Sequence, residues 1–244
     1  MRALSASQLL DVWECGFGRP AAEQALALLA AACPEVSLED LSRLSVGRRN
    51  ARLLALREWT FGSRLEALIA CPACAEQLEL DLQTADLCGG EAEMEGTGSL
   101  SLETAGYSFR FRLPDSTDLV GADAMDPGTL RNHLLARCLL SIRRGSEEIS
   151  LAQLPEAAIH AVAEKMAQAD PQADITFLVA CPACGHAWQA IFDIVTFFGC
   201  EITAWSHRIL NEVNLLASAY GWSEADILAM SPWRRQCYLE IIGT

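Results

Sequence analysis

The sequence has no long hydrophobic run and no export signal at its start. No apolar stretch approaches the about 20 residues that a membrane-spanning helix needs. No basic segment followed by an apolar one opens the chain. We therefore expect a soluble, cytoplasmic protein with no membrane partner. Half of its residues are apolar, so its 244 residues can bury a core in one large or two small domains.

Positive charge is scarce. The chain has 18 basic against 32 acidic residues, a net charge of −14, and Lys165 is its single lysine. Nucleic-acid binding depends on basic patches that contact phosphates. We therefore expect no nucleic-acid partner, although a nucleic-acid-binding zinc ribbon remains an alternative that the charge disfavours.

A catalytic constellation is also missing. The four histidines, His133, His160, His186 and His207, form no recognisable Ser/His/Asp pattern and no metal site with an open position. Three of them fall on expected helices. The sequence therefore predicts a non-enzymatic protein without a small-molecule substrate.

Cysteine, in contrast, recurs in two near-copies of one stretch, Ala70-Cys71-Pro72-Ala73-Cys74 and Ala180-Cys181-Pro182-Ala183-Cys184. We call residues 71–74 the first hook and residues 181–184 the second hook. Each leads into an expected strand, and the N–H groups of such a turn point at the sulfurs. Two facing hooks supply the tetrahedral thiolates that structural zinc takes. We predict a structural Zn²⁺ site at Cys71, Cys74, Cys181 and Cys184.

Two features leave alternatives open. About 100 residues separate the hooks, so either a sizeable insertion divides one site or the hooks belong to different sites. A redox Cys-x-x-Cys would instead open a helix after a strand. Gly185 suits the left-handed position after the second hook, whereas the first has Ala75 there. His186 is a spare ligand candidate. We expect buried, reduced thiols at the six other cysteines: Cys15, Cys33, Cys88, Cys138, Cys200 and Cys237.

The hydrophobic patterns predict an α+β fold, in which a mainly α-helical body carries a four-Cys zinc-ribbon-like β module and a small β-hairpin insertion. The expected parts are an N-terminal helical region (1–70), the zinc-ribbon-like module with its inserted hairpin and two helices (71–194), and C-terminal helices (195–244) that pack on the N-terminal ones. The expected helices are 5–14, 20–33, 47–58, 63–69, 128–143, 155–169 and 195–219, and the expected strands 77–82, 99–104, 107–113, 174–180 and 187–193.

Three stretches have more specific expectations. The helix 47–58 carries Arg48, Arg49, Arg52 and Arg57, which we expect on a solvent-exposed face, with a binding role as the alternative. The long C-terminal helix should bury Phe198, Ile202, Trp205 and Ile209 against the N-terminal helices. Residues 89–98 are rich in Gly and Glu and are expected to form a mobile loop within the segment 84–98, whose role stays open.

Both ends of the chain resemble proteins of phage-tail-like gene clusters. Near the C-terminus the resemblance lies in Trp205-Ser206-His207-Arg208, in Ala219-Tyr220-Gly221-Trp222-Ser223-Glu224-Ala225-Asp226-Ile227-Leu228-Ala229-Met230 and in the segment 234–242. Near the N-terminus it lies in residues 11–20 and 47–54. This pattern is similar to a family of extracellular contractile injection systems related to the T-even phage baseplate hub assembly chaperones. The resemblance covers both ends and the two hooks, and the inserted middle of the chain has no counterpart in it.

The resemblance implies a role in building a baseplate or tail and implies no catalysis. It makes the chain a chaperone-like assembly factor that binds a hub or tail protein of a contractile particle. The alternatives are a resident baseplate component or a general zinc-ribbon protein-binding module. Exposed Trp and Arg are favoured interface anchors, so the expected contact residues are Trp222, Trp233, Arg234 and Arg235.

Overall fold

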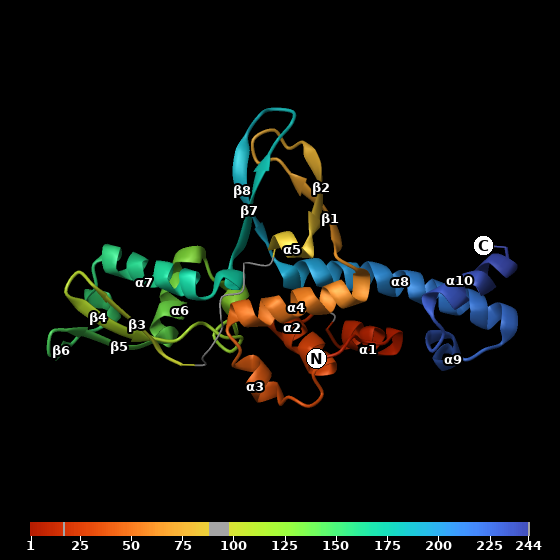
Figure 1. Ribbon diagram of the computed structural model, residues 1–244, viewed down its shortest axis with the longest axis horizontal. Coiled ribbons are helices and arrows are strands. Elements are labelled where there is room, and N and C mark those ends of the chain that lie inside the picture. The colour runs from red at the N-terminus through yellow and green to blue at the C-terminus, as the bar shows by residue number, and fades with distance from the viewer. Residues whose placement is uncertain (17, 88–97, 244) are drawn as a thin grey trace. The chain divides into compact units, whose positions relative to one another are not determined.

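The computed structural model describes residues 1–16, 18–87 and 98–243 (Figure 1). The fold is α+β, as the patterns predict. The chain forms two compact units: residues 1–35 together with 194–244, and residues 36–193. Most of the expected loop 89–98 lies outside the described residues.

The first unit is helical and joins the two ends of the chain. It contains α1 (Ala6–Gly16), α2 (Ala21–Ala32), α8 (Ile194–Tyr220), α9 (Glu224–Leu228) and α10 (Pro232–Ile241). Helix α8 lies against α1 and α2, and the Trp13 ring meets the His207 ring edge-on at a centroid distance of 5.8 Å. Gly221, in the left-handed conformation at φ 67°, follows the end of α8.

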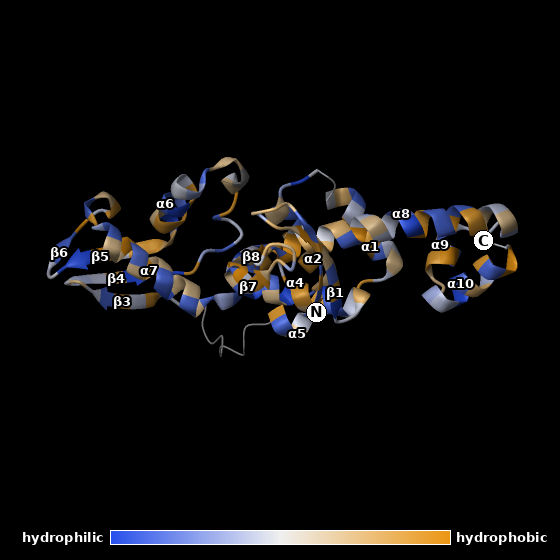
Figure 2. Cartoon of the chain, turned by 90° about the horizontal axis from the view of Figure 1, so that it is seen from above, coloured by the Kyte–Doolittle hydropathy of each residue, from blue (hydrophilic) through white to orange (hydrophobic). Residues whose placement is uncertain are grey.

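One face of α8 supplies much of the core of this unit. Figure 2 shows polar and apolar residues alternating along the ribbon of α8. Phe198, Ile202 and Ile209 are buried, as expected from their spacing, whereas Trp205 is only half-buried. Ser206, one position further along the helix, is fully buried in its place.

The second unit combines short helices with three small sheets. Its helices are α3 (Leu38–Ser42), α4 (Val46–Phe61), α5 (Thr84–Leu87), α6 (Pro127–Cys138) and α7 (Glu156–Ala169), with 3-10 turns at 122–124, 151–153 and 171–173. Its strands are β1 (Arg64–Ala70), β2 (Gln77–Gln83), β3 (Leu100–Thr104), β4 (Tyr107–Phe111), β5 (Leu139–Arg144), β6 (Glu147–Glu148), β7 (Ile175–Ala180) and β8 (Ala187–Phe192). Two antiparallel hairpins, β1-β2 and β7-β8, stand apart from the antiparallel sheet β3-β4-β5-β6.

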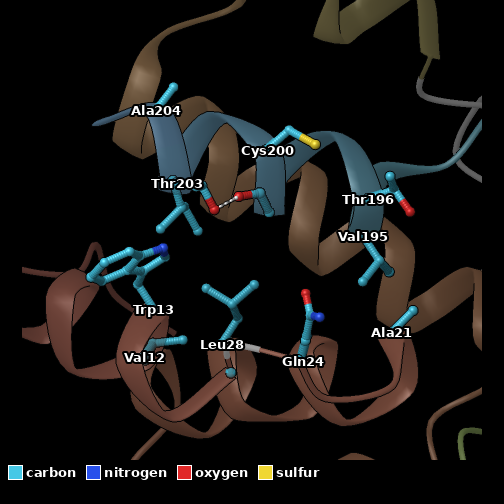
Figure 3. A pocket seen from close by; sticks show the side chains of 14 residues that line it. Val12, Trp13, Ala21, Gln24, Leu28, Val195, Thr196, Cys200, Thr203 and Ala204 are labelled. Carbon is cyan, nitrogen blue, oxygen red and sulfur yellow. Dashed lines mark hydrogen bonds between the residues drawn. The ribbon is translucent and has the colours of Figure 1, made fainter. Parts of the chain in front are cut away.

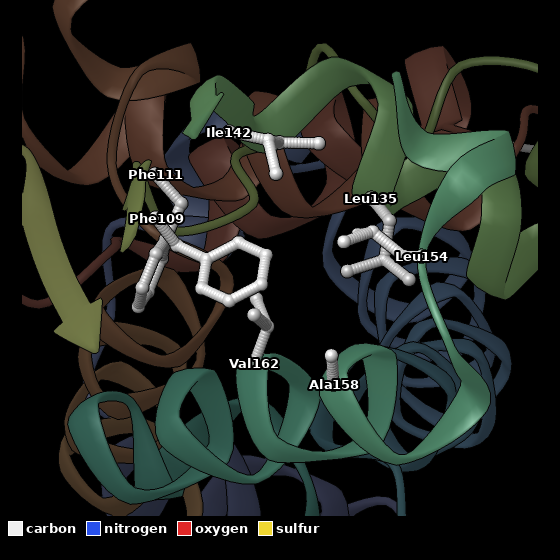
Figure 4. Close-up of a cluster of buried hydrophobic side chains, with 7 residues drawn as sticks. All are labelled: Phe109, Phe111, Leu135, Ile142, Leu154, Ala158 and Val162. Atoms are coloured by element: carbon white, nitrogen blue, oxygen red, sulfur yellow. The ribbon is translucent and has the colours of Figure 1, made fainter. Parts of the chain in front are cut away.

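The four-stranded sheet and helices α6 and α7 enclose a core of their own. Phe109 and Phe111 of β4 are fully buried and face Ile142 of β5, Leu135 of α6 and Val162 of α7 (Figure 4). The alternation in 107–113 predicted which residues of β4 point inward. The inserted middle of the chain is thus a small α/β layer with its own apolar centre.

Two predictions of secondary structure were wrong. Most of the segment 63–69, expected as a helix, belongs to strand β1 (Arg64–Ala70), because all seven residues of that strand pair with β2. The helix expected over 128–143 ends at Cys138, and Leu139–Arg144 instead forms β5, which pairs with β4 and buries Ile142. Residues in both segments have an ordinary propensity for helix. They form strands instead because pairing with a neighbouring strand buries their apolar face.

The expectation for the arginines of α4 was wrong as well. Arg49 and Arg57 are buried, 5% and 2% exposed, and Arg48 and Arg52 are half-buried. Arg49 donates to the Asn50 Oδ1 and the Ser116 Oγ atoms, and Arg57 donates to the Gly62 carbonyl at 2.7 Å. These long side chains bury their stems and hydrogen-bond internally instead of forming a solvated face.

None of the described helices combines the length and the apolar character needed to cross a membrane. Among the single cysteines, Cys33 and Cys138 are buried free thiols, as expected, whereas Cys15 and Cys200 are exposed. Cys237 is half-buried, and Cys88 lies outside the described residues.

Candidate metal centre

Each hook is the turn of a β-hairpin. The first hook joins β1 to β2, and the second hook joins β7 to β8. In both hairpins the residue just before the first cysteine of the hook pairs with the residue six positions after that cysteine. These pairs are Ala70 with Gln77 and Ala180 with Ala187. The structure therefore places both hooks at equivalent points of two matching hairpins.

The backbones of the two hooks match bond for bond. The Cys71 N–H donates to the Glu76 carbonyl at 2.9 Å, and the Cys181 N–H donates to the His186 carbonyl at 2.8 Å. The residue after each hook takes the left-handed conformation, Ala75 at φ 60° and Gly185 at φ 71°. Alanine at this position in the first hook leaves the turn unchanged, at the cost of backbone strain that glycine avoids.

The four cysteine sulfurs converge on one point. The Cys71 and Cys184 Sγ atoms lie 3.7 Å apart, as do those of Cys74 and Cys181, and all four lie within 4.8 Å of one another. Four thiolates at about 2.3 Å from a zinc ion form a tetrahedron with edges of about 3.8 Å. The spacing and the all-sulfur donor set therefore fit one tetrahedral metal ion, and the hooks belong to the same cluster.

Backbone hydrogen bonds prepare the sulfurs for a cation. Burial disfavours the Cys71 thiolate, but the N–H groups of Ala73 and Cys74 outweigh burial and lower its pKa to about 7. The Glu76 N–H also favours the Cys74 thiolate, yet the adjacent sulfur of Cys184 raises the pKa of Cys74 to about 12. A second thiolate is repelled by the first, and a divalent cation at the centre offsets that repulsion.

Apolar side chains fix the hairpins against each other beneath the cluster. The inward faces of the four strands contribute to one hydrophobic group that also contains Cys71 and Cys181. Its other members are Ile69, Leu78, Leu80, Phe177, Val179, Trp188 and Ala190. The metal centre thus sits at the end of a small two-hairpin core, which holds the four ligands in place.

The outer faces of the hairpins differ in charge. The first presents Arg64, Glu66, Glu79 and Asp81, with ion pairs from Arg64 to Glu66 and Asp81. The second presents no charged side chain over 175–180 and 187–192, and Leu178 and Ile191 are each 75% exposed. The hairpins therefore match in backbone while offering different surfaces. His186, the spare ligand candidate, is exposed and stacks on Trp188 with the ring centroids 5.9 Å apart.

The expected contact residues near the C-terminus do not share one environment. Trp233 is 78% exposed, and Arg234 is exposed above the Tyr238 ring. Trp222 is half-buried and stacks on Tyr220 at a centroid distance of 4.4 Å. Arg235 is buried, donating to the Glu212 Oε2 at 3.0 Å and to the Met230 carbonyl at 2.7 Å. Arg235 therefore ties α10 to α8 and is no exposed anchor.

Of the cavities that the described residues line outside the metal centre, two bear on function. One, of about 550 Å³, opens between α1, α2 and the first turns of α8 (Figure 3). Trp13, Leu28 and Val195 make its wall largely apolar, and the described residues that line it include no carboxylate or histidine. The other, of about 740 Å³, lies between α3, α4 and the loop after β4. Four arginines line it, which the sequence analysis missed because it placed those of α4 in solvent.

The two matching hairpins bring four cysteine sulfurs into one cluster whose spacing and donor set fit a single metal ion. A sequence model of one family, described as T4 bacteriophage base plate protein, matches residues 19–199. This chain belongs to that family of baseplate proteins. Neither the curated proteins nor the solved structures give a match to it.

The family match overlaps the resemblance only in part. It spans residues 19–20, 47–54 and both hooks, which the resemblance also covers, together with the inserted middle, for which the resemblance has no counterpart. It ends at residue 199, before the stretch 205–242 where most of the resemblance lay. The residues of the inserted sheet and its helices thus lie within the matched range.

Proposed function

We propose that the chain is a non-enzymatic, chaperone-like assembly factor for the baseplate hub or tail of a contractile phage-tail-like particle, and that one structural zinc ion organises its two hairpins. Membership of the baseplate family is the observation that carries this proposal. The partner is then another protein of the baseplate, a hub or tail subunit.

Cys71, Cys74, Cys181 and Cys184 would hold the zinc. Four thiolates close the coordination shell, so the ion has no position for water or substrate and supplies cross-linking, not catalysis. The ligand pairs are 113 and 107 residues apart in sequence, so the ion closes a long loop around the inserted sheet. Closing such a loop restricts the unfolded chain and stabilises the fold.

The C-terminal helices offer a contact surface for the partner. The exposed Trp233 and Arg234 are residue types favoured at interfaces, and they stand on α10 beside the Tyr220, Trp222 and Tyr238 rings. Replacing both by alanine should weaken pull-down of the hub subunit. Arg208→Ala, an exposed arginine on α8, is the matched control. Unchanged pull-down would remove this contact surface and leave the assembly role in place.

Deletion of the gene tests the assembly role. The deletion strain should make no full-length sheathed particles when lysates are viewed by electron microscopy, and the wild-type gene supplied in trans should restore them. The amounts of the strain's secreted enzymes and the transcription of the particle genes should stay normal. Intact, fully active particles from the deletion strain would contradict the proposal.

The family description favours a second candidate, a resident baseplate component, because it names a base plate protein. Mass spectrometry of purified, finished particles separates the two. An assembly factor is absent from them or far below the amount of the hub subunit. A resident component is present in a fixed ratio to it.

A further inference from the structure

The cavity between α3, α4 and the loop after β4 holds two arginines that make no close ion pair with a described residue, although the charge of Arg48 acts on the buried Asp170 carboxylate. We call it the arginine cavity; it is lined by Val36, Asp40, Arg43, Leu44, Arg48, Arg52, Arg112, Asp115 and Thr117. Arg48 and Arg52 lie one turn apart on α4 and are half-buried. Neither side chain makes an ion pair or hydrogen bond with a residue that the structure describes.

The other charges of the cavity are already engaged. Arg43 pairs with Glu39 at 2.8 Å, and Arg112 holds the buried Asp118 through two hydrogen bonds of 2.6 and 2.8 Å. On the acidic side, Asp40 accepts from the Ser37 hydroxyl. Asp115 accepts from the Thr117 N–H at 2.8 Å. Arg48 and Arg52 are therefore left as adjacent like charges, an arrangement that disfavours the free helix.

This arrangement is unusual for so acidic a chain. With 32 acidic residues against 18 basic ones, carboxylates are abundant, yet none of the described ones pairs with Arg48 or Arg52. A guanidinium that is partly removed from water binds a carboxylate through two parallel hydrogen bonds. The guanidinium groups of Arg48 and Arg52, one helical turn apart, therefore match two carboxylates at a similar spacing.

We propose that the arginine cavity binds an acidic segment of a partner protein, with two carboxylates on Arg48 and Arg52 and an apolar side chain against Val36 and Leu44. This inference rests on the proposed function, since it locates a binding site for a baseplate subunit. Four arginines against two carboxylates make the lining net positive, so a short acidic segment confined to the cavity is attracted, whereas a long polyphosphate chain would also meet the acidic surface of the chain.

The test probes overlapping peptides of the baseplate proteins encoded beside this chain. Wild-type protein should bind peptides with paired Asp or Glu residues, and Arg48→Ala/Arg52→Ala should weaken this binding at least about tenfold. Arg19→Ala/Arg208→Ala removes the same charge outside the cavity and should bind as wild type does. Glu→Gln changes within a bound peptide should abolish its binding. Because neither guanidinium makes a close contact with a described carboxylate and Arg48 acts on Asp170 only through its charge, their removal should lower the melting temperature only slightly.

Several outcomes would overturn the inference. These are equal binding by Arg48→Ala/Arg52→Ala, no peptide bound by the wild type, a preference for neutral peptides, and binding of duplex DNA that the double variant loses. The particle assay of the deletion strain is independent of these results, so the proposed function stands or falls separately.

Discussion

The carboxylate of Asp170 accepts a hydrogen bond from the backbone N–H of Gly47 at 2.9 Å, although 123 residues separate them. Asp170 is 2% exposed and also accepts from the Ser45 hydroxyl at 3.1 Å. Asn50, three residues after Gly47 on α4, donates a hydrogen bond to the Gln172 carbonyl. The first turn of α4 is thus tied to the end of α7 through buried polar groups.

Gly47→Ala should destabilise the protein by about 2 kcal/mol or more, because a Cβ at residue 47 would collide with the Asp170 carboxylate and lie 2.8 Å from the Ala173 nitrogen. Helix propensity alone predicts the opposite sign, a gain of about 1 kcal/mol. Urea unfolding measures the change. Gly199→Ala on α8 is the control, since its Cβ meets only Gln24 Oε1 at 3.4 Å. A stabilised Gly47→Ala would contradict the close approach.

Cys74→Ser should remove the zinc and lower the melting temperature by more than about 5 °C, because one lost thiolate opens the shell that holds the two hairpins together. Elemental analysis and calorimetry on the same sample measure both. Cys15→Ser is the matched control, an exposed cysteine outside the cluster that should change neither. If both variants keep zinc equally, the ligand set is wrong.

Exchanging the residues after the hooks should shift stability in opposite directions. Ala75→Gly relieves a left-handed alanine and should stabilise by about 1 kcal/mol, whereas Gly185→Ala introduces one and should destabilise by about as much. A Cβ at Gly185 meets nothing within 4 Å, so backbone strain alone is measured. Denaturant unfolding of the zinc-loaded protein gives both values, and two shifts of the same sign would refute the matching geometry.

Asp118 should make the free energy of unfolding depend on pH in the acidic range. Its burial disfavours the carboxylate, but hydrogen bonds from Arg112, the Asp115 N–H and Arg137 outweigh burial and hold its pKa well below the usual range. This stabilisation is complete above the unfolded pKa of about 3.9 and is lost as pH falls through the folded pKa. Asp118→Asn should cost about 2 kcal/mol at neutral pH, less than a fully buried pair because both arginines are partly exposed.

Unfolding curves across pH check this prediction. The difference between wild type and Asp118→Asn should narrow below about pH 4. Asp81→Asn removes a carboxylate from an exposed ion pair with Arg64 and should change stability far less. A constant difference between wild type and Asp118→Asn across that range would show that the residue acts by shape and not by charge.

The sequence predicts the convergence of the four cysteines because its signal is local. Each Cys-Pro-Ala-Cys stretch fixes its own turn, and two copies in front of alternating strands suggest that they face each other. The strand β1 was missed because Leu65, Ala67 and Ile69 suit a helix as well as a strand, and only pairing with β2 decides between them. The same holds for β5, whose partner β4 lies beyond an intervening helix.

Long-range polar contacts were harder to predict. Nothing near Arg49 in the sequence announces its bond to Ser116, 67 residues away, so a helix rich in arginine was expected to face water. The arginine cavity was missed for the same reason. Trp205 matched the apolar spacing of α8, but the buried stripe passes through Ser206 instead.

X-ray absorption at the zinc edge of protein purified without chelator tests the central claim most directly. We predict one zinc per chain with four sulfur neighbours at about 2.3 Å and no nitrogen or oxygen in the first shell. A shell of two sulfurs with lighter atoms, or protein without zinc, would contradict a single metal centre built by both hooks.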